Sequence, residues 1–286
     1  MQLAKRLELL VQLQSYMLSN DAGWQAVKEK AYTHNGWFIP QFIDLAAKNI
    51  ATYLLTRTHL QHWITTYNIP GEQQQVKTIG IIMPGNIPMT GFYDFLCVFL
   101  SGHRQRIKLS PTDDVLLKHL VNTLAGWDSD VHNLVSFDDM LKGCDAYLTT
   151  ENRNTKALEK YYNKYPHIIH SNATSVALLT GEETRQQLEL LADDVFQYFG
   201  QGCLNVNKVF VPKDYDFIPL LKAFDKYGYL IDHNKYKNNY DYQLAMLILN
   251  KEFYMTNGSI LLTENASHSA PIARLHYEYY SDADDV

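Results

Sequence analysis

The sequence predicts an α/β protein with parallel sheets, because strand-like and helix-like segments alternate from residue 76 onward. A short apolar run typical of a buried strand opens this region at Val76–Met83, and a largely apolar helix follows at Gly91–Leu100. Connections between parallel strands are right-handed crossovers, and the intervening helices cover the sheet. We therefore expect parallel sheets with covering helices.

The later elements continue the same alternation. We expect strands at Arg106–Leu109, Asp145–Thr149, Val176–Leu179 and Val206–Val211, and helices at Asp114–Leu124, from about Asn152, at Glu183–Phe199 and at Phe217–Lys226. Residues 1–66 lack clear strand signals, and apolar residues at helical spacing predict helices there. Pro70-Gly71 then breaks the helical pattern. We expect an N-terminal helical segment over residues 1–70, followed by two domains at 71–175 and 176–286.

Composition, charge and motif content argue against several classes of protein. The formal net charge of -6 argues against a nucleic-acid binder, which would carry a basic face. No apolar run approaches the roughly 18 residues that a membrane span needs. Three cysteines without an export signal predict a reducing, cytoplasmic location. No His-x-x-x-His or Cys-x-x-Cys pair is present, so no metal site is expected.

Polar residues, glycines and prolines that the strands lack occur together in four segments. They are Pro84–Pro88, Ser110–Asp113, Thr150–Asn154 and Gly200–Asn205. In open α/β sheets, ligands bind beyond the carboxyl ends of the strands. We therefore expect all four segments to lie at such ends.

Cys203 is the strongest candidate for a nucleophile. It lies among small residues in Gly200-Gln201-Gly202-Cys203, where a substrate carbonyl can approach the sulfur and the next strand fixes its position. The other two cysteines, Cys97 and Cys144, are expected to be packing residues. Asn86 carries a side-chain NH2 that can donate to an oxyanion without titrating. Taken alone, Asn86 also fits a turn asparagine that bonds its own backbone, so both interpretations stay open.

The order of these segments resembles the aldehyde dehydrogenase superfamily. That family has a Pro-x-Asn-x-Pro turn, then an apolar helix, a strand ending near Lys-Pro-Ser, and a Gly-Gln-x-Cys motif. The matching segments here are Ile82–Pro88, then Phe92–Leu109 followed by Ser110-Pro111-Thr112, and later Gly200–Cys203. More closely, the chain from about residue 34 resembles the acyl-CoA reductases, including the luminescence-type fatty acyl reductases. The segments that carry this closer resemblance are His34–Phe38, Gly85–Pro88, Phe95–Gly102, Asn205–Pro212 and Asn238–Tyr242.

The resemblance implies a role for each matching residue. Cys203 would be the nucleophile, and Asn86 would form the oxyanion hole together with the Cys203 backbone N–H. Residues 71–175 would be the dinucleotide-binding domain and residues 176–286 the catalytic domain. The residues expected to contact the cofactor are Pro84, Lys108, Ser110, Thr149, Thr150, Asn152 and Arg153.

Four departures from the family pattern refine the expected chemistry. Thr150–Asn154 lacks the usual Gly-Ser, so the cofactor phosphates are expected to contact Asn152, Arg153 and the N-terminus of the following helix. The stretch Ile168–Asn172 lacks the glutamate that activates water in hydrolytic members, which favours thioester reduction over aldehyde oxidation. Pro111 replaces a glutamate that bonds the ribose hydroxyls in many NAD-dependent members, which favours NADPH. Ser267 and His268 lie where a second, nicotinamide-side glutamate is usual, so either side chain could take its place.

We therefore expect NADPH-dependent reduction of a fatty acyl-CoA or acyl-protein thioester to the aldehyde. The alternative is a non-catalytic or acyl-transfer relative that binds acyl thioesters without hydride transfer. The sequence does not identify the group that would activate Cys203; Lys208 and His170 are two candidates among others. The chain ends at Val286, earlier than the family leads us to expect, which suggests a shortened C-terminus. A homodimer is the default for the superfamily.

Overall fold

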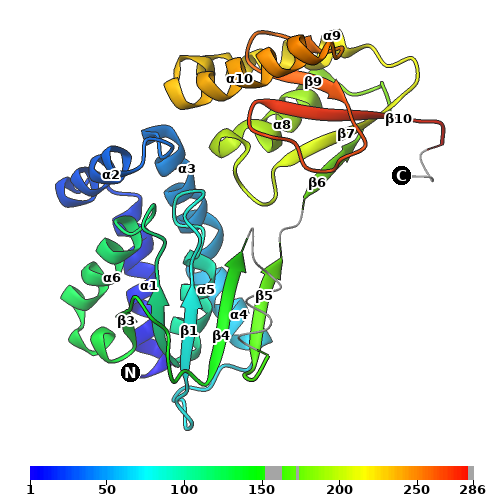
Figure 1. The fold of residues 1–286 in the computed structure, drawn as a ribbon. Coiled ribbons are helices and arrows are strands. Elements are labelled where there is room, and N and C mark those ends of the chain that lie inside the picture. Colours follow the sequence, from blue (N-terminus) through cyan, green and yellow to red (C-terminus); the bar gives the residue numbers. More distant parts are fainter. Residues whose placement is uncertain (152–162, 172–173, 283–286) are drawn as a thin grey trace. The chain divides into compact units, whose positions relative to one another are not determined.

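Figure 1 shows the computed structural model of the chain, which describes residues 1–151, 163–171 and 174–282. By their internal contacts the residues form two compact units, Met1–Asn172 and Ala173–Val286. Each unit contains a five-stranded sheet with helices packed against it, and each is described by itself. Among the described residues, no helix combines the length and apolar character needed to cross a bilayer.

The sheet of the first unit is parallel throughout, in the order β3-β2-β1-β4-β5. Its strands are β1 (Thr78–Ile82), β2 (Arg104–Lys108), β3 (Val135–Phe137), β4 (Ala146–Glu151) and β5 (His167–Ser171). The first strand along the chain, β1, is central in the sheet. β2 and β3 follow on one side of it, and the chain then crosses to β4 on the other side. A reversal of this kind opens a ligand crevice at the carboxyl ends of the two strands where it occurs, β1 and β4.

Helices from both sides of residue 70 belong to this first unit. They are α1 (Leu3–Met17), α2 (Ala22–His34), α3 (Pro40–Asn49), α4 (Arg57–Thr66), α5 (Phe92–Ser101) and α6 (Leu116–Trp127), with a π-helical turn η1 (Ile50–Leu54) and a 3-10 segment η2 (Ser129–Asn133). The apolar α5 packs against β1 and β2, and α1 packs against α5 and α6. The N-terminal helices therefore share a core with the first sheet.

The second unit has the strand order β6-β7-β10-β9-β8, parallel except for β8. Its strands are β6 (Ser175–Leu178), β7 (Val206–Pro212), β8 (Met255–Thr256), β9 (Leu261–Glu264) and β10 (Arg274–Tyr280). Its helices are α8 (Arg185–Phe196), α9 (Phe217–Phe224) and α10 (Asn234–Asn250), with 3-10 segments η3 (Gln197–Gly200) and η4 (Asp225–Asp232). In Figure 1, α8 and α9 lie side by side, and they also contact each other directly.

The α/β class with two mainly parallel sheets and a helical N-terminus is confirmed. Several strands were not expected, namely β3, β5 and the last three strands of the chain. β5 is hidden from a hydrophobic pattern because two of its five residues, His167 and His170, are histidines. The helix expected to begin near Asn152 lies outside the described residues.

Candidate active site

The first unit brings most of the predicted cofactor residues to one edge of its sheet. Pro84 and Asn86 follow β1, Lys108 ends β2 and is followed by Ser110, and Thr149 lies near the end of β4. The backbone joins these segments directly, since Met83 N–H donates to Lys108 O at 3.0 Å and Ile82 is the β-ladder partner of Thr149. Asn86 is half-buried and Lys108 is exposed. Thr150 lies in β4, while Asn152 and Arg153 fall outside the described residues.

The loop that carries Asn86 interlocks with the loop after β2. The Thr112 hydroxyl donates to Gly85 O at 2.9 Å, and the Ser110 and Thr112 hydroxyls lie 2.8 Å apart. A Cβ added at Gly85 would lie 2.3 Å from Thr112 Oγ1 and 2.6 Å from Ser110 Oγ. Position 85 therefore requires glycine, because any side chain would push the two loops apart.

A buried carboxylate, Asp113, fixes the far end of the Asn86 loop. Its Oδ2 accepts the backbone N–H of Met89 at 2.7 Å, and Met89 has the left-handed φ of 56° that non-glycine residues rarely adopt. Burial raises the pKa of Asp113 to about 7. Among the described residues, its other oxygen, Oδ1, is buried without a hydrogen-bond partner. Asp113 lies in the segment Ser110–Asp113 that the sequence placed at a strand end, but nothing in the sequence indicated its bond to Met89.

The same edge has groups that suit a nucleotide. Thr149 is 1% exposed, and its Oγ1 is a buried polar atom without a hydrogen-bond partner among the described residues. A cavity of about 320 Å³ lies beside the ends of β2 and β3, and Pro111 contributes to its wall. Two carboxylates in that wall are neutralised by cations, Asp114 by Lys118 at 2.9 Å and Asp138 by Arg106 at 2.9 Å.

In the second unit, Cys203 lies half-buried in a turn that a single asparagine side chain holds in place. Asn205 is 8% exposed; its Nδ2 donates to Asp194 O at 2.7 Å and to Gln197 O at 3.1 Å. Its Oδ1 accepts the Gly202 N–H at 2.7 Å. Asn205 therefore satisfies carbonyls at the end of α8 and binds the residue before Cys203 with the same amide.

The chain enters this turn through a strained backbone. The expected helix Glu183–Phe199 ends instead at Phe196, because Tyr198 and Phe199 both adopt left-handed conformations, with φ of 55° and 59°. Each costs on the order of 1 kcal/mol for a residue with a Cβ. Burial of Phe199, whose ring centroid lies 4.7 Å from that of His233 and 5.7 Å from that of Tyr236, offsets the strain. Strain of this kind clusters at functional sites.

One expectation about the position of the Cys203 segment was wrong. Residues 200–205 precede β7 and therefore lie at its amino end, whereas the segments after β1, β2 and β4 lie at carboxyl ends. The expectation placed every polar segment after a strand, at the carboxyl edge of a parallel sheet, although this segment comes before one. A nucleophile in a turn between a helix and the next strand necessarily lies at the opposite edge of its own sheet.

The two candidates for activating Cys203 have different environments. Lys208 is 1% exposed, and its ammonium group bonds Ala266 O at 2.9 Å and forms an ion pair with Glu278. His170, on β5 in the first unit, lies 3.3 Å from the Asp94 carboxylate and remains largely open to solvent. Lys208 is thus fully occupied by structural contacts, and His170 keeps an accessible face.

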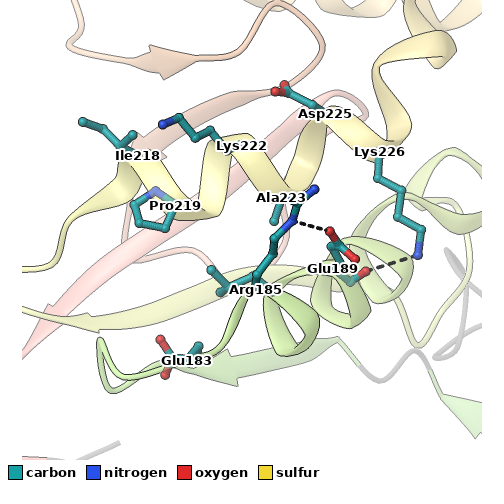
Figure 2. Close-up of a pocket in the computed structure, with 10 residues that line it drawn as sticks. Glu183, Arg185, Glu189, Ile218, Pro219, Lys222, Ala223, Asp225 and Lys226 are labelled. Atoms are coloured by element: carbon teal, nitrogen blue, oxygen red, sulfur yellow. Dashed lines mark hydrogen bonds and ion pairs between the residues drawn. The ribbon is translucent and has the colours of Figure 1, made fainter.

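A cavity in the second unit lies apart from the predicted site residues. It has a volume of about 760 Å³ and lies between α8 and α9 (Figure 2). Figure 2 shows Arg185 and Lys226 directed at Glu189 in its wall, with the Arg185–Glu189 pair at 2.7 Å. Among the described residues, no group of three or more His, Cys, Asp or Glu side chains could hold a metal ion.

The two other cysteines differ in burial. Cys144 is buried, as expected for a packing residue, whereas Cys97 is only half-buried and borders a surface hollow with Trp63 and Tyr93. Burial raises the pKa of Cys97 to about 11 and also raises that of Cys144. Neither thiol is therefore readily ionised near neutral pH.

Comparison with known proteins assigns the fold. No family model matches the chain, and no curated protein matches its sequence. Solved structures match over the whole chain. A putative aldehyde dehydrogenase from Burkholderia cenocepacia is 12% identical with a TM-score of 0.71, covering 100% of this chain and 71% of that one. Aldehyde dehydrogenase 21 from Physcomitrella patens, in complex with succinate, is 10% identical with a TM-score of 0.72, covering 100% and 70%.

The fold is that of the aldehyde dehydrogenases. An indole-3-acetaldehyde dehydrogenase in complex with NAD+ gives the same result, with 11% identity, a TM-score of 0.69 and coverage of 99% of this chain and 68% of that one. At such low identity the likeness concerns the fold alone. What this chain does must be argued from its own residues.

Proposed function

We propose that the protein reduces acyl-CoA or acyl-protein thioesters to aldehydes, with NADPH as the reductant and Cys203 as the nucleophile. The observation that carries the proposal is the half-buried Cys203, held in a strained, hydrogen-bonded turn within an aldehyde dehydrogenase fold. The stretch Ile168–Asn172 lacks the glutamate that activates water in hydrolytic aldehyde dehydrogenases, and this supports reduction over hydrolysis.

The chemistry divides into acyl transfer and reduction. In the first stage the Cys203 thiolate attacks the thioester carbonyl, the new C–S bond forms, and the bond to the leaving thiol breaks. Asn86 donates to the oxyanion that develops, and a single such donor contributes roughly 3 kcal/mol of transition-state stabilisation. The interlocked loops at Gly85 and the Asp113–Met89 bond keep the Asn86 turn in one conformation.

The residues at the edge of the first sheet suit a nicotinamide dinucleotide. When bound, NADPH supplies the hydride that reduces the acyl-enzyme. Lys108, Ser110 and Thr149 would hold its adenosine and phosphate parts, with Pro84, Thr150, Asn152 and Arg153 as further predicted contacts. Pro111 lacks the carboxylate with which a glutamate at this position would repel a 2′-phosphate.

Mass spectrometry tests acylation and reduction separately. Wild-type protein incubated with a long-chain acyl-CoA gains one acyl adduct on Cys203, and adding NADPH removes the adduct with loss of absorbance at the NADPH band. Cys203→Ala loses both signals. Cys97→Ala is the matched control, since it removes a thiol that is not readily ionised and should keep both.

Two outcomes would contradict the proposal. An adduct that NADPH does not discharge would identify an acyl-transfer protein instead of a reductase. Absence of any adduct on Cys203, with acyl-CoA and acyl carrier protein both tried as donors, would overturn the covalent mechanism itself.

A further inference from the structure

A surface hollow of the first unit is lined by aromatic rings from α4 and α5. Its volume is about 350 Å³, which lies within the range of small-molecule sites. Trp63 lies on α4, and Tyr67 follows it one helical turn later. On α5, Tyr93 and Cys97 are also one turn apart and face the same hollow. The rest of the wall consists of Ile69, Pro70, Leu100 and Ser101.

The end of α4 folds the chain back to build one side of the hollow. Asn68 adopts a left-handed φ of 49° after the helix, and its N–H donates to Thr65 O at 3.3 Å. The next N–H, that of Ile69, donates to Ile64 O at 3.0 Å. These two bonds form a Schellman motif, which ends a helix and is often followed by a proline, here Pro70. Backbone hydrogen bonds therefore fix the side of the hollow that Ile69 and Pro70 form.

The two tyrosine rings stand almost at right angles to the indole of Trp63. The centroid of Trp63 lies 5.4 Å from that of Tyr93 at an interplanar angle of 80°, and 6.4 Å from that of Tyr67 at 90°. Trp63 is half-buried, whereas Tyr67 is 71% and Tyr93 48% exposed. Perpendicular rings do not cover one another's faces as stacked rings do, so ring faces remain available to a ligand in the hollow.

The wall favours a positively charged ligand over a negatively charged one. None of the described residues that line it is charged, so an anion would find no cationic side chain there. The face of an aromatic ring is its negative side and attracts organic cations, with tryptophan the strongest of the rings. Burial chiefly raises the pKa of Cys97 to about 11, and the negative charge of the buried Asp94 adds to that rise. The field of the Asp94 carboxylate therefore reaches this wall.

We propose that the hollow binds an organic cation of the trimethylammonium class, with the cationic group against the rings of Trp63, Tyr67 and Tyr93. A trimethylammonium group combines a positive charge with an apolar surface, so it suits both the ring faces and the aliphatic part of the wall. Binding involves no covalent step. None of the wall residues belongs to the candidate nucleophile, oxyanion or cofactor residues, so this site is distinct from the proposed active site.

A choline titration followed through the tryptophan indole N–H signals in NMR spectra tests the proposal. The protein has four tryptophans, and the signal that is absent from Trp63→Phe belongs to Trp63. Sodium chloride at about 150 mM screens non-specific attraction of the cation to the acidic protein. Under these conditions choline should shift the Trp63 signal and leave the other indole signals in place. The neutral molecule 3,3-dimethyl-1-butanol has the same shape without the charge and should bind about tenfold more weakly.

Substitutions of the exposed tyrosines identify the rings that hold the cation. Tyr67→Leu and Tyr93→Leu each remove one ring from a solvent-exposed position and keep an apolar side chain there. Each should weaken choline binding about fivefold and change the binding of the neutral analogue less. Tyr32→Leu is the matched control, because Tyr32 on α2 is 42% exposed and lies outside the wall of the hollow. Its affinity for choline should equal that of the wild type.

Three results would overturn the proposal. Equal affinity for choline and its neutral analogue would identify a purely apolar hollow. Equal losses in Tyr32→Leu and Tyr93→Leu would show that the rings of the wall do not hold the cation. A Trp63 signal that choline does not shift would show that choline does not bind there. The titration uses neither a thioester nor NADPH, so its outcome is independent of the proposed reductase.

Discussion

The amide of Asn205 shows how much one side chain can determine about the geometry of the turn that carries Cys203, the proposed nucleophile. It binds the end of α8 through Asp194 O and Gln197 O, and it binds the turn through the Gly202 N–H. Both contacts involve backbone atoms, so no other side chain needs to change for the turn to loosen. The position of Cys203 therefore depends on the hydrogen bonds of the Asn205 side chain.

We predict that Asn205→Asp disturbs Cys203 more than it disturbs folding. The aspartate keeps an acceptor for Gly202 N–H but places a second oxygen against Asp194 O, and loss of a buried hydrogen bond costs about 1–3 kcal/mol. Unfolding in urea should show a loss of that size, and iodoacetamide alkylation of Cys203 should change severalfold. Asn239→Ala is the control, because Asn239 donates to Lys235 O on the exposed face of α10 and lies far along the sequence from the turn. Equal alkylation rates in all three proteins would show that Asn205 does not position the thiol.

Asp113 makes the stability of the first unit depend on pH. Burial raises its pKa to about 7 from the ordinary value of 3.8, so the folded state retains a proton that the unfolded chain releases. Ionising this buried carboxyl destabilises the folded state. The destabilisation is absent below about pH 4, grows as the pH rises, and is complete above about pH 7, where it amounts to a few kcal/mol.

We predict that Asp113→Asn removes this dependence. Asparagine has nearly the same shape, its Oδ1 can accept the Met89 N–H, and it does not titrate. The difference in unfolding free energy between the variant and wild type should therefore grow in favour of the variant from pH 4 to 7. Urea titrations at several pH values measure this difference. The other carboxylates are present in both proteins, so their contributions to the pH dependence subtract out. A constant difference across that range would show that Asp113 is ionised throughout.

At the scale of elements, α8 is a helix whose two ends serve different purposes. Its N-terminus has a capping box, in which the Thr184 hydroxyl accepts the Gln187 N–H and the Gln187 side chain accepts the Thr184 N–H. Its C-terminus is closed by Asn205 instead of by a glycine. The N-terminal cap should stabilise the fold, whereas the C-terminal contacts should also determine the reactivity of the thiol.

Thr184→Ala tests this division. Loss of a threonine cap costs about 1 kcal/mol, which should appear as a lower urea midpoint with an unchanged slope. The alkylation rate of Cys203 should stay at the wild-type value, because the cap lies at the other end of the helix. A fall in both stability and alkylation rate would indicate that loosening the N-terminus of α8 also disturbs the turn at its C-terminus.

Elements with strong local signals were predictable from the sequence. β1, α5 and β7 are apolar enough to be recognised, and the alternation of strands and helices implied parallel sheets. β5 was missed because its histidines break the apolar pattern, and β10 because Arg274, His276 and Glu278 share one of its faces. The end of α8 was missed because left-handed Tyr198 and Phe199 depend on tertiary packing, which no local propensity encodes.

The candidate site was predictable in its residue types but not in its supports. Cys203 and Asn86 stand in recognisable motifs. The hydrogen bonds of Asn205 and Asp113 and the contact of Asp94 with His170 were not predicted, because each involves a residue distant in sequence or a backbone atom. A lone Asp94 within an apolar helix was the one available signal, since a buried acid requires a partner.

At the scale of the whole molecule, the two units divide the proposed chemistry. Unit Met1–Asn172 carries Asn86 and the predicted cofactor residues, and unit Ala173–Val286 carries Cys203. Ligand binding stabilises the state that binds it, by about 2.7 kcal/mol at a concentration one hundred times the dissociation constant. A ligand that contacts one unit only should therefore protect that unit selectively.

Hydrogen exchange with a cofactor fragment provides that test. We predict that 2′-phospho-ADP-ribose, which lacks the nicotinamide, slows exchange in peptides that cover residues 82–90, 106–114 and 146–151, and leaves peptides from β6 to β10 unchanged. ADP-ribose should protect the same peptides more weakly, because Pro111 removes the carboxylate that would favour free ribose hydroxyls. Lys108→Ala should abolish most of the protection, and Lys77→Ala, an exposed lysine just before β1 at the other end of the sheet, should not. Protection confined to the second unit would contradict the assignment of the cofactor to the first sheet, and stronger protection by ADP-ribose would assign NADH instead of NADPH.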